Sequence, residues 1–234
     1  MYLTLLATML KDMSNSHNTA IIVAAGKGTR FGGNTPKQFL KLDGREILDY
    51  SVRTFQSNAN IESVIIVSAR EHMKRIQLLY PECKIVAGGT IRQISVLNGL
   101  AAVMEKTDNV LVHDAARPLV SHTIIDACLH TLSSCDGVAP GITPFDSMLL
   151  LEGSDVKNLP RENLRIVQTP QCFPTEVLRQ ALASGLTDTD ELGLVRQAIP
   201  NARLCLVEGS RSNMKITGPE DLIFLESLLH ADKA

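Results

Sequence analysis

The chain lacks the cysteine patterns that mark a zinc site or a disulfide framework. Its five cysteines are scattered, with no C-x-x-C pair and no zinc-ligand spacing: Cys83, Cys128, Cys135, Cys172 and Cys205. An odd number of widely separated cysteines favours reduced thiols in a cytosolic protein over paired disulfides. The sequence therefore predicts five free thiols that pack as small apolar groups, and a cytoplasmic location.

A strong net charge and a membrane-spanning segment are also missing. There are 23 Lys and Arg residues against 25 Asp and Glu, a formal net charge of −2, so the overall field attracts neither nucleic acid nor an anionic membrane. The apolar start, MYLTLLATML, is too short to span a bilayer and is followed by KDMSNSHN rather than a small-residue cleavage site. We expect an N-terminal extension over residues 1–18, no nucleic-acid partner and no membrane contact.

Several catalytic and nucleotide-binding patterns are absent too. The sequence contains no G-x-S-x-G nucleophile elbow and no G-x-x-x-x-G-K-[ST] phosphate loop. The stretch from Gly26 to Phe31 begins like a dinucleotide-binding fingerprint but lacks its last glycine. These absences count against a serine hydrolase, a P-loop enzyme and a dinucleotide-dependent oxidoreductase.

What the sequence does have is a regular alternation of short apolar runs and helix-period segments. Runs typical of strands cover Thr19–Ala24, Ser63–Ser68, Lys84–Ala87, Val110–His113 and Arg203–Val207. Between them, apolar side chains at helical spacing form two stripes: Leu48, Val52 and Phe55, then Ile94, Leu97, Ala101 and Met104. The pattern predicts an α/β protein, a Rossmann-like three-layer α/β/α domain with a mainly parallel central sheet, over residues 19–231.

Two further segments have distinct signatures. From about 141 to 165, Pro and Gly punctuation and the flanked GSD turn predict a β-hairpin that leaves the sheet as a protruding β-arm. Near the C-terminus, Thr217 and Glu220 fit a capping box, followed by Leu222, Leu225 and Leu229 on one helical face.

A glycine-rich loop follows the first predicted strand. The stretch AIIVAAGKGTRFGGNTPKQ, residues 20–38, holds four glycines and the cations Lys27, Arg30 and Lys37, but no acidic residue. Ligands of open α/β sheets bind beyond the carboxyl ends of strands, and glycines let backbone N–H groups turn toward an anion. A solvated turn with incidental cations remains the alternative, but the lack of carboxylates favours a polyphosphate ligand.

Other candidate groups each have an ordinary explanation as well. Asp114, at the end of VLVHD, can hold Mg²⁺ or a sugar hydroxyl, or simply cap a turn, and His113 fits a packed histidine better than a metal ligand. In GGTIRQISV, two glycines precede a helix carrying Arg92 and Ser95, which suits contacts with a base or phosphate or a tight turn. The TDTDE stretch is explained by N-capping, and Arg161 and Lys215 by solvation.

Taken together, these motifs resemble the 2-C-methyl-D-erythritol 4-phosphate cytidylyltransferase family of the nucleoside-diphosphosugar pyrophosphorylase-like superfamily. The similarity extends from about Thr19 to Leu229 and rests on AAGKGTRFGGNTPKQF, GGTIRQISV, VHDAARP, QTPQCF, TDE and SNMKITGPEDL, in the family's order. It implies that CTP and methylerythritol 4-phosphate react to CDP-methylerythritol and pyrophosphate, with Mg²⁺, in non-mevalonate isoprenoid synthesis.

The resemblance also implies roles for individual residues. The cations implied to be catalytic are Arg30, Lys37 and Lys215. The implied CTP site consists of Ala24, Ala25, Gly26, Gly28, Gly89, Ser95, Asp114 and Ala115, with Asp114 also near the metal. The implied site for the second substrate consists of Arg117, Ser147, Arg161, Thr169 and Thr189.

In this family the β-arm crosses to a second subunit, so the resemblance implies a homodimer in which Arg161 acts in trans. Two positions depart from the family's pattern. Ile91 stands where many members carry an acidic residue, and the DSMLL stretch containing Ser147 replaces a more usual D-T-hydrophobic-K sequence.

Three other functions stay open at this point. A related cytidylyltransferase that uses ribitol 5-phosphate shares the glycine loop, TPQ and the terminal lysine motif. A dinucleotide-binding oxidoreductase would explain the sheet and the first glycine loop, but would leave Arg30 and Lys37 without a purpose. A nucleotide-binding protein without catalytic activity would share the whole pocket.

Overall fold

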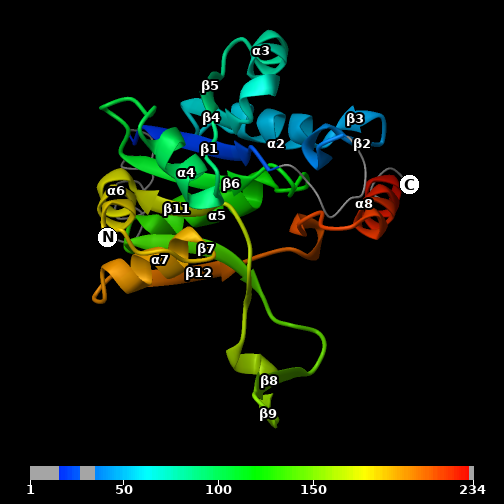
Figure 1. Ribbon diagram of the computed structural model, residues 1–234, viewed down its shortest axis with the longest axis vertical. Helices are drawn as coiled ribbons and strands as arrows, with labels where there is room; N and C mark the ends of the chain where they lie inside the picture. The colour runs from blue at the N-terminus through cyan, green and yellow to red at the C-terminus, as the bar shows by residue number, and fades with distance from the viewer. Residues whose placement is uncertain (1–15, 27–34, 232–234) are drawn as a thin grey trace, which may run out of the picture.

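One mixed, mostly parallel sheet organises the protein (Figure 1). The computed structural model describes residues 16–26 and 35–231, and all structural statements below concern these residues. The strands run in the order β10-β7-β11-β6-β1-β4-β5, and β12 pairs with β7. Their bounds are β1 (Asn18–Ala24), β4 (Ser63–Ser68), β5 (Lys84–Ala87), β6 (Asn109–Asp114), β7 (Gly137–Ile142), β10 (Ile166–Val167), β11 (Gln171–Pro174) and β12 (Leu204–Glu208). Of the expected extension over residues 1–18, only the last three residues are described, and Asn18 already belongs to β1.

Four parallel strands bring their carboxyl ends to the same edge of the sheet. In the register of β1, Ala24 lies opposite Ser68 of β4, and Val23 lies opposite Asp114 of β6. Ser68 in turn lies opposite Ala87 of β5. The glycine turns that follow β1 and β5 and the aspartate that ends β6 therefore meet at one edge.

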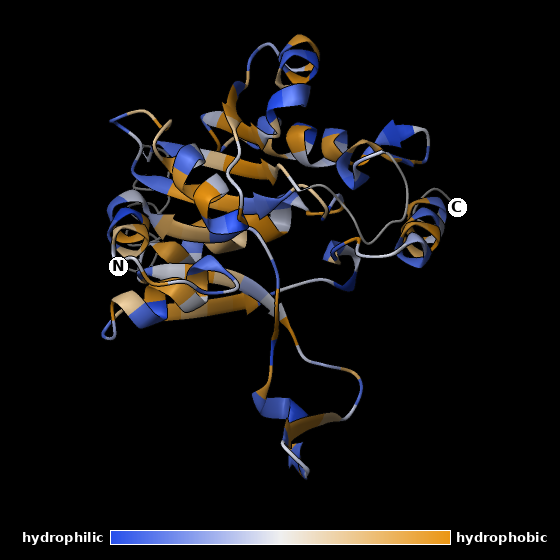
Figure 2. Ribbon diagram, viewed as in Figure 1, coloured by the Kyte–Doolittle hydropathy of each residue, from blue (hydrophilic) through white to orange (hydrophobic). Residues whose placement is uncertain are grey.

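Helices cover both faces of the sheet, which confirms the predicted three-layer α/β class (Figures 1 and 2). Neighbouring strand residues such as Ile21 and Ile22 are both fully buried but belong to opposite cores. One core is shared with α2 (Ile47–Gln56), α3 (Arg70–Leu79) and α5 (His122–Leu132), and the other with α4 (Arg92–Leu100), α6 (Thr175–Ala183) and α7 (Glu191–Ala198). Burial from both sides explains why the strands are almost continuously apolar.

The predicted apolar stripe of α4 is wrong. Ile94, Leu97 and Met104 are exposed, and the helix instead buries the face that contains Val96 and Gly99. At Gly99 a Cβ would lie 2.5 Å from the Ile21 Cγ2 atom, so the absence of a side chain lets α4 pack directly against β1. Close packing through a glycine has no signal in a hydrophobicity pattern.

The cap of the last helix, α8 (Pro219–Ala231), differs from the predicted box by one residue. Asp221 Oδ2, rather than a Glu220 oxygen, accepts the N–H groups of Thr217 (2.6 Å) and Gly218 (2.9 Å). Because the helix begins at Pro219, Asp221 is its third residue, the position from which a carboxylate reaches back over the first turn. The predicted inner face is confirmed, since Leu225 is fully buried and Leu222 and Leu229 pack around it.

The prediction of five free thiols is wrong for one pair. Cys135 and Cys205 form a disulfide across a sequence separation of 70 residues. Cys205 lies in β12, which pairs with β7, and β7 begins two residues after Cys135. Strand pairing therefore brings together two cysteines whose spacing in the sequence carries no signal. Cys83, Cys128 and Cys172 are free and buried, as predicted.

The remaining elements are short. A separate two-stranded sheet of β8 (Met148–Glu152) and β9 (Asp155–Leu159) extends away from the body of the protein (Figure 1). The others are β2 (Lys41–Leu42), β3 (Arg45–Glu46) and the 3₁₀ turns η2 (Lys37–Phe39), η3 (Arg161–Asn163) and η4 (Arg211–Asn213). Within the described ranges, every helix is too short or too polar to cross a membrane.

Candidate active site

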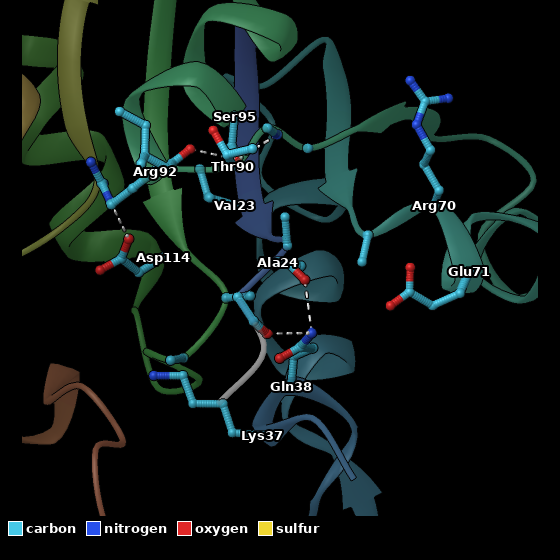
Figure 3. A pocket seen from close by; sticks show the side chains of 18 of the residues that line it. Val23, Ala24, Lys37, Gln38, Arg70, Glu71, Thr90, Arg92, Ser95 and Asp114 are labelled. Carbon is cyan, nitrogen blue, oxygen red and sulfur yellow. Dashed lines mark hydrogen bonds and ion pairs between the residues drawn. The ribbon is translucent and has the colours of Figure 1, made fainter. Parts of the chain in front are cut away.

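A cavity of about 810 Å³ opens at the edge where the four parallel strands end (Figure 3). Its walls come from six segments that are far apart in the sequence. They are residues 23–26, 37–38, 69–71, 88–92 with Ser95, 114–116, and Lys215. The cavity thus brings together both glycine turns, the aspartate at the end of β6 and two lysines from opposite ends of the chain.

The residues predicted from sequence fall into three groups. Those that line the cavity are Ala24, Ala25, Gly26, Lys37, Gly89, Ser95, Asp114, Ala115 and Lys215. Those that do not line it are Arg117, Ser147, Arg161, Thr169 and Thr189. Gly28 and Arg30 lie outside the described residues. The structure therefore assembles most of the predicted nucleotide site, whereas the residues predicted for the second substrate lie elsewhere.

Gln38 holds the first glycine turn in place. Its buried side chain donates from Nε2 to the carbonyl oxygens of Ala24 (2.8 Å) and Gly26 (3.2 Å). Because both carbonyl oxygens accept hydrogen bonds from Gln38, the orientation of the peptide groups in this turn is fixed. The neighbouring Lys37 donates from Nζ to the carbonyl of Ile216 (3.1 Å), which links this turn to the segment before α8. Sequence reasoning missed Gln38 because its partners are backbone atoms.

The second glycine turn packs tightly between β1 and α4. The Gly88 N–H donates to the Ser68 carbonyl (2.8 Å), and the Gly89 N–H donates to Ser95 Oγ (3.1 Å). A Cβ on Gly88 would lie 2.3 Å from the Ala25 Cβ atom. Glycine is therefore required here for the two turns to approach each other.

Asp114 is the charged centre of the cavity. Its carboxylate accepts from Arg92 Nε at Oδ1 (3.1 Å) and from Lys215 Nζ at Oδ2 (2.6 Å), and it is almost fully buried. Burial alone raises the pKa of Asp114, but the charges of Arg92 and Lys215 outweigh burial and hold that pKa well below its usual range. The group is an anion at neutral pH.

Arg92 connects Asp114 to a second buried carboxylate, which sequence reasoning missed. Arg92 Nη1 donates to both oxygens of Glu191, at 2.5 and 2.7 Å. Glu191 is the first residue of α7, and the preceding Asp190 caps that helix by accepting the Gly193 N–H (2.8 Å). The predicted capping function of this stretch is thus confirmed for Asp190, but the ion pair of Glu191 has no local sequence signal.

Behind Asp114, His113 is a buried neutral histidine. Its Nε2 donates to the Arg117 carbonyl (3.1 Å), so Nδ1 accepts from the Thr169 hydroxyl (3.0 Å). Burial lowers the pKa of His113 to about 4. Thr169 Oγ1 also accepts the Asp114 N–H (3.1 Å), so this predicted substrate residue is occupied in orienting the end of β6.

The other predicted residues of the second-substrate site lie outside the cavity. Arg117 is mostly buried and donates from Nη1 to the Asn213 carbonyl (2.8 Å), and burial lowers its pKa. Thr189 is exposed and bonds to Asp188, while Arg161 donates to the Phe145 carbonyl (2.7 Å) at the root of the β8–β9 hairpin. Ser147 is exposed beside β8.

The donor set fits a magnesium ion only if the substrate supplies further ligands. No group of three or more His, Cys, Asp or Glu side chains is arranged for metal binding within residues 16–26 and 35–231. Mg²⁺ often takes only one or two carboxylates and completes its shell with phosphate oxygens and water. Asp114 supplies one such carboxylate at the cavity wall, where each of its oxygens also accepts a hydrogen bond, from Arg92 or from Lys215.

We expect the substitution Gly88→Ala to weaken nucleotide binding, because the added methyl group would collide with Ala25 and push the two glycine turns apart. The dissociation constant for CTP, measured by titration calorimetry, should rise by about 10-fold or more, a change of about 1.4 kcal/mol. Ala183→Ser is the control, because Ala183 is an exposed residue of α6 that does not line the cavity. Unchanged CTP affinity in Gly88→Ala would refute this steric requirement.

Comparison with known proteins assigns the chain to a family. The family model described as IspD, 2-C-methyl-D-erythritol 4-phosphate cytidylyltransferase, matches residues 18–231. A protein of that name from Clostridium novyi is 37% identical over 227 residues, covering 92% of this chain and 97% of the relative, and one from Aeromonas hydrophila is 40% identical over 214 residues, covering 87% and 86%.

A solved structure agrees with this assignment. The crystal structure of 4-diphosphocytidyl-2C-methyl-D-erythritol synthase from Anaerococcus prevotii superposes with a TM-score of 0.85 at 25% identity, covering 95% of this chain and 99% of that one. The match extends along the whole sheet and its helices, so sequence and fold lead to one assignment: the chain belongs to the 2-C-methyl-D-erythritol 4-phosphate cytidylyltransferase family.

Proposed function

We propose that the protein transfers the cytidylyl group of CTP to 2-C-methyl-D-erythritol 4-phosphate, forming CDP-methylerythritol and pyrophosphate in non-mevalonate isoprenoid synthesis. Family membership supports this activity. The structural observation that carries it is the meeting of Lys37 and Lys215 in one cavity with the glycine turn at Ala24–Gly26. Ribitol 5-phosphate and the oxidoreductase alternative are not favoured by the family match.

The reaction needs no nucleophile from the protein. A phosphate oxygen of methylerythritol 4-phosphate attacks the α-phosphorus of CTP, and the bond between the α-phosphorus and the bridging oxygen breaks as pyrophosphate leaves. Charge accumulates around the α-phosphorus, so positioned cations lower the barrier. Lys37 and Lys215 are proposed to supply this charge, and Arg30 remains a third predicted cation.

The other end of the cavity suits the nucleoside. The backbone of Ala24, Ala25 and Gly26 is proposed to bind CTP through N–H groups. Gly89 and Ser95, which are bonded to each other, are proposed to line the same site beside the nucleoside. Asp114 and Ala115 would lie near the ribose and the phosphates. Asp114 would hold Mg²⁺ together with CTP phosphate oxygens, and the ion would neutralise part of the phosphate charge.

The second substrate is tested directly by pyrophosphate release. With CTP and Mg²⁺, methylerythritol 4-phosphate should give rapid release, and ribitol 5-phosphate should give at least about 100-fold lower kcat/KM, because polar groups built for one polyol stay unpaired with another. Each polyol phosphate is supplied separately, and CTP alone serves as the control. A preference for ribitol 5-phosphate would reverse the choice of substrate.

Replacement of either lysine should separate catalysis from binding. We expect Lys37→Ala and Lys215→Ala each to lower kcat by about 100- to 1,000-fold, the usual cost of one positioned charge-stabilising donor. The dissociation constant for CTP should change much less, because these cations bind the transition state more tightly than the ground state.

Lys74→Ala is the matched control, since Lys74 is an exposed lysine of α3 that does not line the cavity. If the lysine variants lost CTP affinity in proportion to kcat, the chain would have only the properties of a nucleotide-binding protein.

We also infer that the β8–β9 hairpin mediates a homodimer. All five residues of β8 are exposed, and Leu149 and Leu151 share one face with Val156 of β9. A lone two-stranded hairpin is marginally stable in water, and exposed apolar strands favour association. Dimerisation would bring Arg161 and Ser147 toward a partner's cavity, where they could complete the site for the second substrate with Arg117 and Thr189.

The double substitution Leu149→Ser/Leu151→Ser should shift the protein from dimer to monomer in sedimentation experiments, because it removes apolar area from one face of the hairpin. The KM for methylerythritol 4-phosphate should rise by about 10-fold or more, with CTP affinity retained. Lys157→Ala, on the same hairpin, is the control. A wild-type protein that is monomeric and fully active would contradict the dimer.

A further inference from the structure

Glu191 is a buried charged residue that the proposed chemistry does not use. It is 2% exposed, does not line the cavity, and directs both carboxylate oxygens to Arg92 Nη1 (2.5 and 2.7 Å). Burying a carboxylate is costly unless it is paired and hydrogen-bonded. Apolar side chains in place of this ion pair would avoid the free-energy cost of removing two charges from water.

The pair continues into the cavity as a chain of alternating charges. Arg92 Nε reaches Asp114 Oδ1 (3.1 Å), and Asp114 Oδ2 accepts from Lys215 Nζ (2.6 Å). Two cations and two anions thus form one neutral network from the start of α7 to the segment before α8. Figure 3 shows the Arg92 guanidinium directed at Asp114 from the α4 side of the cavity.

The network fixes directions as well as charges. A guanidinium is planar, so a contact at Nη1 determines where Nε points. With Nη1 held by Glu191, the Nε–H group of Arg92 is directed at one oxygen of Asp114. The other oxygen is then the one that faces Lys215.

We propose that Glu191 is a positioning residue for cytidylyl transfer, acting through Arg92 to orient Asp114 and thereby the ammonium group of Lys215. The inference rests on the proposed function, because it assigns Glu191 to the placement of a proposed catalytic cation. Glu191 itself does not line the cavity.

The attachment of α7 to the sheet, which would be a purely structural function for Glu191, is already provided by other residues. The start of α7 is capped by Asp190, and Gln171 of β11 donates to Asp190 Oδ2 (2.9 Å) and accepts the Leu192 N–H (2.9 Å). The Asp190 cap and the two bonds to Gln171 hold the start of α7 on the sheet without Glu191. The ion pair with Arg92 is not needed to attach α7 to the sheet. It connects the helix to the active site instead.

The test is a double-mutant cycle with Glu191→Gln and Arg92→Lys in the full-length protein. Glu191→Gln should lower kcat by about 10- to 100-fold, the usual cost of losing a partner that orients a functional group. The dissociation constant for CTP should change by less than about threefold, since misplacement of Lys215 affects mainly the transition state. In the Arg92→Lys background the same substitution should change kcat by less than about twofold, because the guanidinium that transmits its effect is gone.

Asp49→Asn is the matched control. Asp49, on α2, accepts from Arg53 of the same helix (2.7 Å), from Arg45 (2.8 Å) and from Tyr80 just after α3 (3.1 Å), all outside the cavity. The variant therefore neutralises another ion-paired carboxylate without touching the network. Its kcat should be unchanged even where its stability to urea falls. Should Glu191→Gln fail to fold, the cycle is run with Glu191→Asp, which keeps the charge but shortens the reach and should lower kcat by about 3- to 10-fold.

The outcomes separate the two proposals. If the wild-type enzyme turns over normally, two results would overturn the positioning function alone. The Glu191 variants could keep full kcat, or their losses in kcat could multiply with the loss caused by Arg92→Lys. A wild-type protein that releases no pyrophosphate with CTP and either polyol phosphate would overturn the proposed function and the inference with it. Non-multiplicative losses in kcat with unchanged CTP affinity support the inference.

Discussion

The arrangement of the cavity depends on one buried carboxylate between two cations. Asp114 ends β6 in the middle of the sheet and receives Arg92 on one oxygen and Lys215 on the other. Because an unpaired buried charge would be strongly destabilising, Asp114 draws α4 and the segment before α8 toward the same edge of the sheet. That edge is also where the two glycine turns end, so a single electrostatic requirement gathers the groups that face the cavity.

Local positive charge then arises in a protein whose overall charge is slightly negative. Asp114 balances only part of the charge of Arg92, Lys37 and Lys215, while Glu191 neutralises Arg92 from behind. Lys37 and Lys215 remain directed at the cavity beside backbone N–H groups of the glycine turns. A triphosphate is the natural complement of such a surface, since two lysines and the backbone of a glycine turn face the same part of the cavity.

The two halves of the proposed reaction have different structural bases. The proposed nucleotide site lies at the edge of the sheet where the parallel strands of one chain end. Gln38 orients the backbone at Ala24, and Thr169 orients the backbone at Asp114. Three of the residues predicted for the second substrate, Ser147, Arg161 and Thr189, are exposed, and Arg161 stands at the root of a hairpin that extends into solvent. This division is what a site completed by a second copy of the chain would require.

The sequence by itself determined the α/β class, the strands Ser63–Ser68 and Lys84–Ala87, and the glycine turns and cations, because each has a local pattern of apolar runs or loop residues. Tertiary structure alone decided which face of α4 is buried, that Cys135 pairs with Cys205, and that Glu191 binds Arg92. These contacts join residues far apart in the chain, so they depend on the order of strands in the sheet and on close packing at Gly99. Neither the strand order nor a tight helix–strand contact leaves a trace in local composition or spacing.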